Sequence, residues 1–212
     1  MVQFDRNVIT QGLHPAAEIL LKFFRQIWNI SGDQKVPRDS PLLILSNHPG
    51  MTDTLGLISQ IPREDLKIIA ASRPFLQALP SLEDRLILVS DTGGLSTLKP
   101  ALEHLKSGGA ILSFPAGRIE PDPRLDPHGA KSSQEQWFRS AIFFKRQIPG
   151  LKVLTLEVSG VISPESQKLL FLKLWKNKEA RGKVAAVLQL LQMIYPHGKK
   201  ILKPIVQVKS LE

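Results

Sequence analysis

The middle of the chain alternates short apolar runs with stretches in which apolar residues recur at helical spacing. An apolar run of roughly four to eight residues has the length of a buried strand, whereas apolar residues three and four positions apart form one face of a helix. The predicted strands cover residues 42–45, 67–71, 86–90, 110–114 and 153–158, and the predicted helices cover residues 53–60, 73–79, 96–106 and 133–148. This alternation predicts an α/β fold, a single domain with a mostly parallel central sheet flanked by helices.

A longer amphipathic helix is predicted near the N-terminus, over residues 14–30. Its apolar face contains Phe23 and Trp28, and Lys22 and Arg25 lie around the rest. A helix that packs on a sheet has this pattern, and so does an interfacial helix whose apolar face enters lipid headgroups. Core packing is the commoner use of such a helix, and we expect it here.

Positive charge is concentrated in the C-terminal quarter of the chain. The net charge of the 212 residues is +9, and residues 166–212 carry ten Lys or Arg against two Glu. Two apolar helices, at 167–175 and 183–195, and an edge strand at 204–208 are predicted here. An anionic membrane surface, nucleic acid phosphates or simply a solvated face would each explain the charge. The predicted organisation is one domain with an N-terminal helical region at 1–40, a core at 41–163 and a basic C-terminal region at 164–212.

Composition excludes several classes of site. The chain has no cysteine, which excludes disulfides, thiolate zinc sites and thiol catalysis and fits a reducing compartment. Its five histidines lack the spacing of metal ligands, so no metal site is expected. The N-terminus lacks the apolar core of a signal peptide, and no window holds the roughly 18 apolar residues of a membrane span. We therefore expect a cytoplasmic protein, soluble or bound peripherally to the inner face of a membrane.

The strand predicted at 42–45 leads into a turn with candidate catalytic residues. The apolar run ends before Asn47, His48 follows, and Asp53 can cap the next helix. Open α/β sheets hold their ligands at the carboxyl ends of their strands, where this turn would lie. We expect His48 and Asp53 to meet there, with the carboxylate fixing the tautomer of a histidine general base. A loop histidine beside a helix-capping aspartate without a catalytic role would show the same spacing.

No nucleophile accompanies this histidine. The chain has no cysteine and no Gly-x-Ser-x-Gly elbow, so an acyl-enzyme on Ser or Cys has no obvious carrier. The base would instead have to activate a hydroxyl group of a substrate.

A second motif, FPAGR at residues 114–118, follows another predicted strand. Gly117 would let backbone N–H groups approach an oxyanion or a phosphate, and Arg118 would supply positive charge. A plain turn with a surface arginine is the alternative interpretation. Because the His48 motif is also present, we favour a functional loop.

The order of these motifs, NHxxxxD and then FPxG, resembles the glycerolipid acyltransferase family, the PlsC-like enzymes that move an acyl chain from a thioester to a lysophospholipid or glycerol phosphate. The resemblance covers about residues 41–163. It implies that His48 is the general base and that Asp53 orients it. It also implies that substrate is bound by Asn47, Asp91, Phe114, Pro115, Gly117 and Arg118.

Three positions depart from the commonest family pattern. The family strand end that matches Asp91 carries an Asp-Arg pair, which helps to hold the acceptor phosphate, but Thr92 follows here. The commonest second motif is FPEGTRS, whereas this chain has Ala116 in place of Glu and Ile119 after Arg118. The sequence is more similar to the FPxGR variants of bacterial branches that include ornithine-lipid and haemolysin-like acyltransferases. The sequence therefore leaves the identity of the acceptor open.

The resemblance implies transfer of a fatty acyl chain from acyl-CoA or acyl carrier protein to a hydroxyl of a lysophospholipid, a glycerol phosphate or a related lipid. The acyl thioester would be a co-substrate, and no further cofactor is expected. The basic C-terminal region would hold the enzyme on the membrane surface, and no nucleic acid partner is expected. The alternative is a basic protein that binds lipid or nucleic acid without catalysis.

Overall fold

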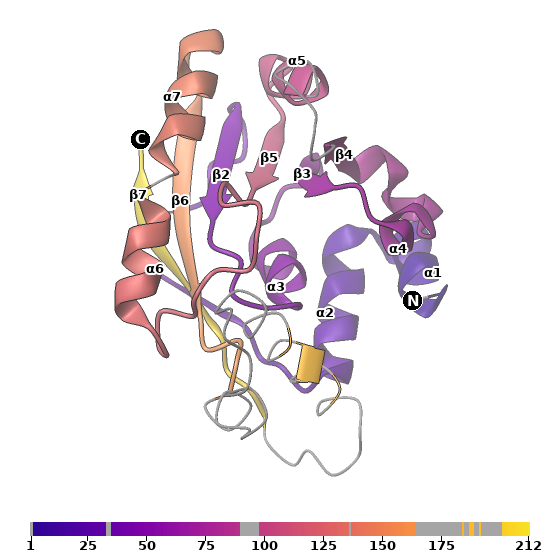
Figure 1. Ribbon diagram of the computed structural model, residues 1–212. Helices are drawn as coiled ribbons and strands as arrows, with labels where there is room; N and C mark the ends of the chain where they lie inside the picture. The colour runs from indigo at the N-terminus through magenta and orange to yellow at the C-terminus, as the bar shows by residue number, and fades with distance from the viewer. Residues whose placement is uncertain are drawn as a thin grey trace.

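The computed structural model of this chain describes residues 2–32, 35–89, 98–135, 137–163 and 201–212, together with positions 184, 187, 188 and 191. Within this part of the chain, seven strands form one sheet, and helices pack against both of its faces (Figure 1). The predicted α/β fold with a mostly parallel central sheet flanked by helices is confirmed.

The sheet places one strand, β2, in its interior. The strands are β1 (Asn29–Ser31), β2 (Leu42–Ser46), β3 (Leu66–Ala71), β4 (Leu86–Val89), β5 (Ala110–Ser113), β6 (Lys152–Ser159) and β7 (Ile205–Leu211). Their order is β1-β7-β6-β2-β5-β3-β4, and every neighbouring pair is parallel except β6 and β7. All five residues of β2 are buried, as expected for a strand with a neighbour on each side and helices over both faces.

The helices complete two hydrophobic clusters, one on each face of the sheet. They are α1 (Val2–Gln11), α2 (Leu13–Phe23), α3 (Asp53–Gln60), α4 (Pro74–Gln77), the 3-10 helix η1 (Pro80–Arg85), α5 (Lys99–Lys106), α6 (Pro127–Gln134) and α7 (Phe138–Gln147). Leu42 and Ile44 enter the cluster that contains residues of α1, α2 and α3, whereas Leu43 and Leu45 enter the cluster that contains residues of α5 and α7. The alternation of side chains along β2 thus joins both halves of the core.

The helix predicted over residues 14–30 is wrong in its extent and in its buried face. The helix α2 ends at Phe23, Arg25 adopts a left-handed φ of 54°, and the chain then enters β1. The buried residues of α2 include Ala16 and Ala17, whose small side chains let the helix lie close to its neighbours, whereas Phe23 is 63% exposed. Trp28, which was predicted on the apolar face, is buried, but it lies after the end of α2. The prediction missed Ala16 and Ala17 because it gave weight to large apolar residues. It also missed α1.

Two further predicted elements differ from the structure. The helix predicted at 133–148 is two helices, α6 and α7, and α6 begins inside the loop predicted at 115–129 because Asp126 caps it by accepting from the Gly129 amide at 2.9 Å. The edge strand predicted at 204–208 is β7, which lies inside the sheet between β6 and β1. The helices predicted at 167–175 and 183–195 fall wholly or mostly outside the described residues.

No helix within the described residues combines the length and the apolar character that a membrane crossing requires.

Candidate active site

The His48 turn joins the end of β2 to the start of α3. Asp53, the first residue of α3, is fully buried, and each of its carboxylate oxygens lies 2.9 Å from Nδ1 of His48. The same carboxylate accepts hydrogen bonds from the backbone amides of Gly50, at 2.9 Å, and Thr54, at 2.8 Å. An ionised carboxylate only accepts hydrogen bonds, so Nδ1 carries the proton of the neutral ring and Nε2 is left as an acceptor.

The His48 ring is placed to act as a base. Its side chain is 29% exposed, in contrast with the buried carboxylate behind it. Burial alone would lower the pKa of His48, but the charge and hydrogen bond of Asp53, with the charge of Glu120, outweigh burial and raise the pKa above its usual value of 6.5. The predicted meeting of His48 and Asp53 is confirmed, while their catalytic role stays a prediction.

The FPAGR loop lies at the same end of the sheet because β5, which precedes it, is the parallel neighbour of β2. The ring of Phe114 lies against the His48 ring, with centroids 4.8 Å apart. Gly117 has a left-handed φ of 61°, and its amide donates to the Phe114 carbonyl at 3.0 Å, which closes a tight turn. The structure thus brings the two predicted motifs together.

The remaining predicted residues have different settings. Pro115 is half-buried, and Gly117 and Arg118 are exposed at the outside of the loop. Asp91 lies outside the described residues. These four residues keep their predicted substrate-binding roles as predictions.

Asn47 is buried and holds the turn against β6. Its Nδ2 donates to the Val158 carbonyl at 2.8 Å, and its Oδ1 accepts from the Val158 amide at 2.6 Å. The side-chain amide therefore pairs with the backbone of β6 where the backbone of β2 has left the sheet. With these atoms engaged, Asn47 positions the His48 turn. Its predicted contact with substrate stays a prediction.

Sequence analysis missed Glu120, which lies beside the His48 turn with 3% of its surface exposed. The Glu120 amide donates to the His48 carbonyl at 2.9 Å, and the His48 amide donates to Oε2 of Glu120 at 3.0 Å. Burial raises the pKa of Glu120, and the interactions of its carboxylate with the Ser133 hydroxyl, the His48 amide and the Trp137 indole oppose that rise. The signal available in the sequence was an acidic residue, Glu120, in the loop that carries the FPAGR motif.

Asp122 is a second buried carboxylate that sequence analysis missed. Its oxygens accept hydrogen bonds from the backbone amides of Arg124, Gly160, Val161 and Ile162, at 3.0 to 3.3 Å. Asp122 thereby fixes the loop that follows β6. That loop packs on the His48 turn so closely that a Cβ at Gly50 would lie 2.5 Å from Val161.

A cavity of about 640 Å³ lies between α6, α7 and the strands β6 and β7. Its wall includes Leu45, Trp137, Ala141 and Val153. Trp137 also donates from Nε1 to Oε1 of Glu120 at 3.3 Å, so one side chain contacts both the cavity and the carboxylate that holds the His48 turn. No group of three or more potential metal ligands occurs among the described residues.

Comparisons with known proteins identify a solved structure with a partly similar fold. No protein-family model matches this chain, and no curated protein matches it. The crystal structure of the 1-acyl-sn-glycerophosphate (LPA) acyltransferase PlsC from Thermotoga maritima matches at a TM-score of 0.47 with 15% sequence identity. The match covers 98% of this chain and 75% of that one.

Proposed function

We propose that this chain is an acyltransferase that moves a fatty acyl group from a thioester to a hydroxyl of a lysophospholipid, a glycerol phosphate or a related lipid. The observation that carries the proposal is the pairing of His48, whose ring reaches solvent, with the fully buried Asp53. A base of this kind, without an attached nucleophile, suits direct activation of an acceptor hydroxyl. The donor would be acyl-CoA or an acyl carrier protein thioester.

The proposed reaction needs no covalent enzyme intermediate. Nε2 of His48 takes the proton of the acceptor hydroxyl, while the oxygen of that hydroxyl forms a bond to the thioester carbonyl carbon. Backbone amides of the loop around Gly117 stabilise the resulting oxyanion, and Arg118 binds an anionic group of donor or acceptor. The carbonyl then re-forms, the carbon–sulfur bond breaks, and the departing thiolate takes the proton from the imidazolium. The products are an ester and a free thiol.

Exposed apolar residues support the further proposal that the enzyme works at a membrane surface. Ile19 and Phe23 of α2 are exposed, and Lys22 of the same helix adjoins Phe23 in the sequence. Ile27 and Ile201, outside this helix, are also exposed. An apolar face flanked by positive charge is suited to lipid headgroups, and the basic residues at 166–212 would add attraction to anionic lipids. The acceptor and the product would both reside there.

The test is release of free thiol from long-chain acyl-CoA by the purified protein. Lysophosphatidic acid, glycerol 3-phosphate and a lyso-ornithine lipid are offered separately, and acyl carrier protein thioesters are compared with acyl-CoA. His48→Ala should abolish acceptor-dependent release, whereas the matched change His128→Ala, at an exposed position on α6, should leave it intact.

The outcomes separate the proposals. Release that requires one acceptor and His48 would establish the reaction and name its substrate. Release that survives His48→Ala would overturn the assignment of the base. If no donor and acceptor pair gives release, the reaction itself is refuted, and salt-dependent binding of DNA or RNA, indifferent to His48, would then favour a nucleic-acid-binding protein.

A further inference from the structure

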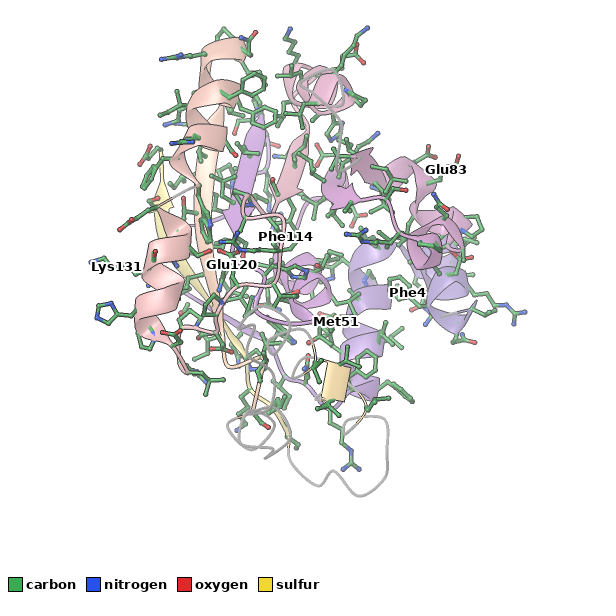
Figure 2. The ribbon with its side chains drawn as sticks, in the orientation of Figure 1. Phe4, Met51, Glu83, Phe114, Glu120 and Lys131 are labelled. Atoms are coloured by element: carbon green, nitrogen blue, oxygen red, sulfur yellow. The ribbon has the colours of Figure 1, made fainter. Side chains whose placement is uncertain are left out.

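The backbone of His48 is held by a reciprocal pair of hydrogen bonds from one residue, Glu120. The Glu120 amide donates to the His48 carbonyl, and Oε2 of Glu120 accepts from the His48 amide. Figure 2 labels Glu120 and Phe114, which belong to the loop after β5 and contact His48. The two strand-end loops are therefore joined at the residue that carries the base.

The second oxygen of Glu120 is also engaged. Oε1 accepts from the indole Nε1 of Trp137 at 3.3 Å. Two N–H donors thus converge on one buried side chain from different sides, and only a carboxylate offers an acceptor oxygen to both. An amide at this position would turn its NH₂ group toward one of the two donors, and a buried donor that faces another donor is costly.

We propose that Glu120 is a positioning residue for the acyl transfer, fixing the peptide of His48 relative to the FPAGR loop so that base and oxyanion donors keep one geometry. This inference rests on the proposed function. Displacement of a catalytic group by about 1 Å can cost roughly 100-fold in rate. The negative charge of Glu120 acts on the same ring, because it favours the protonated form of His48 together with Asp53.

The experiment compares Glu120→Gln, Trp137→Phe and the double variant that combines both. Glu120→Gln leaves one acceptor for two donors and should lower kcat roughly 10- to 100-fold, with a smaller change in KM. Trp137→Phe removes the indole donor but keeps the carboxylate, and should lower kcat less. In the double variant the single amide oxygen is free to accept from His48, so kcat should recover above that of Glu120→Gln alone.

Titration of the His48 ring by NMR gives a readout that does not depend on turnover. Loss of the Glu120 charge should lower the pKa of His48, because an anion beside an imidazolium stabilises it. The acidic limb of the pH profile of kcat/KM should move to lower pH with it. Glu157→Gln is the matched control: Glu157 pairs with Lys209 and Gln134, and its substitution should shift neither quantity.

Each outcome decides the inference. A lowered His48 pKa with a rescued double variant supports the positioning role. Wild-type kcat and His48 pKa in Glu120→Gln would overturn it, and so would a kcat loss that the double variant does not relieve. If the wild-type protein shows no acyl transfer, the proposed function fails by itself, while the His48 titration still shows whether Glu120 acts on that ring. Thermal unfolding of each variant identifies any that fail to fold, and the remaining variants carry the comparison.

Discussion

Replacement of Asp53 by Asn tests the centre of the site because it keeps size and shape while it changes what the side chain can accept. In the native protein Asp53 accepts from the amides of Gly50 and Thr54 and from Nδ1 of His48. An asparagine has one acceptor oxygen, so its NH₂ must face either the Gly50 or the Thr54 amide. The position is fully buried, so solvent does not reach the mismatched donor.

The expected loss of stability follows from the number of hydrogen-bond acceptors that the substitution removes. A buried donor without an acceptor costs about 1–3 kcal/mol, so Asp53→Asn should lower the free energy of unfolding by that amount. For a chain of this size Tm should fall by about 2–4 °C for each kcal/mol. The amide can also donate to Nδ1 of His48 and so select the wrong tautomer, which lowers kcat by roughly 10⁴-fold in a Ser-His-Asp triad. We expect a loss of that order if His48 is the base.

The stability that the His48–Asp53 pair contributes should decrease as pH rises. Because the pKa of His48 is raised in the folded protein, its pairing with Asp53 stabilises the fold most below the pKa of an unfolded histidine, about 6.5. This contribution is lost as pH rises through the raised pKa of the folded state. The stability difference between wild type and Asp53→Asn should therefore be largest at low pH and narrow as pH increases.

Urea unfolding between pH 5.5 and 9, with NMR titration of His48, measures these effects. The matched control is Asp122→Asn, which also leaves a buried amide donor mismatched. The side chain of Asp122 accepts from the amides of residues 124 and 160–162, and not from the His48 ring. It should lose a similar 1–3 kcal/mol and keep the native pKa of His48. A stability difference that is absent, or that widens with pH, would refute the reasoning.

Three further substitutions test other parts of the fold. Gly56→Ala should lower the free energy of unfolding by about 1–3 kcal/mol in urea titrations despite its better helix propensity, because the added Cβ would lie 2.3 Å from the Trp28 ring. Asn47→Asp keeps the acceptor for the Val158 amide but turns a buried carboxylate oxygen toward the Val158 carbonyl. Hydrogen exchange of this turn should accelerate, and the free energy of unfolding should fall by about 3 kcal/mol, with a loss in Tm of about 2–4 °C for each kcal/mol. Arg63→Met removes a buried guanidinium that donates to three backbone carbonyls, and calorimetry should show a loss of about 3 kcal/mol.

The parts of the site that the sequence predicted are local. The run that forms β2, the turn at His48 and the start of α3 at Asp53 lie within 20 residues, so apolar periodicity and capping residues suffice to order them. Both motifs follow predicted strands of a mostly parallel sheet, and the carboxyl ends of parallel strands lie at the same edge. The contact between Phe114 and His48 also requires that β2 and β5 are neighbours, which the sequence did not predict.

The parts that the sequence did not predict depend on contacts between distant residues. Glu120 lies 72 positions from His48, and Asn47 lies 111 positions from Val158. No spacing in one sequence indicates that such residues face each other. The prediction of the buried face of α2 was wrong for a related reason. Ala16 and Ala17 become core residues only where another element approaches closely.

The place of β1 in the sheet has a consequence for the order in which the protein folds. β1 pairs only with β7 among the described strands, and its Ser31 hydroxyl donates to a carbonyl 175 positions further along the chain. Closing so long a loop is entropically costly, so we expect β1 to pair with β7 late in folding. Trp28, just before β1, lies against Gly56 in the helix that begins at Asp53. A segment that is expected to dock late thus also supplies the side chain that covers one face of α3.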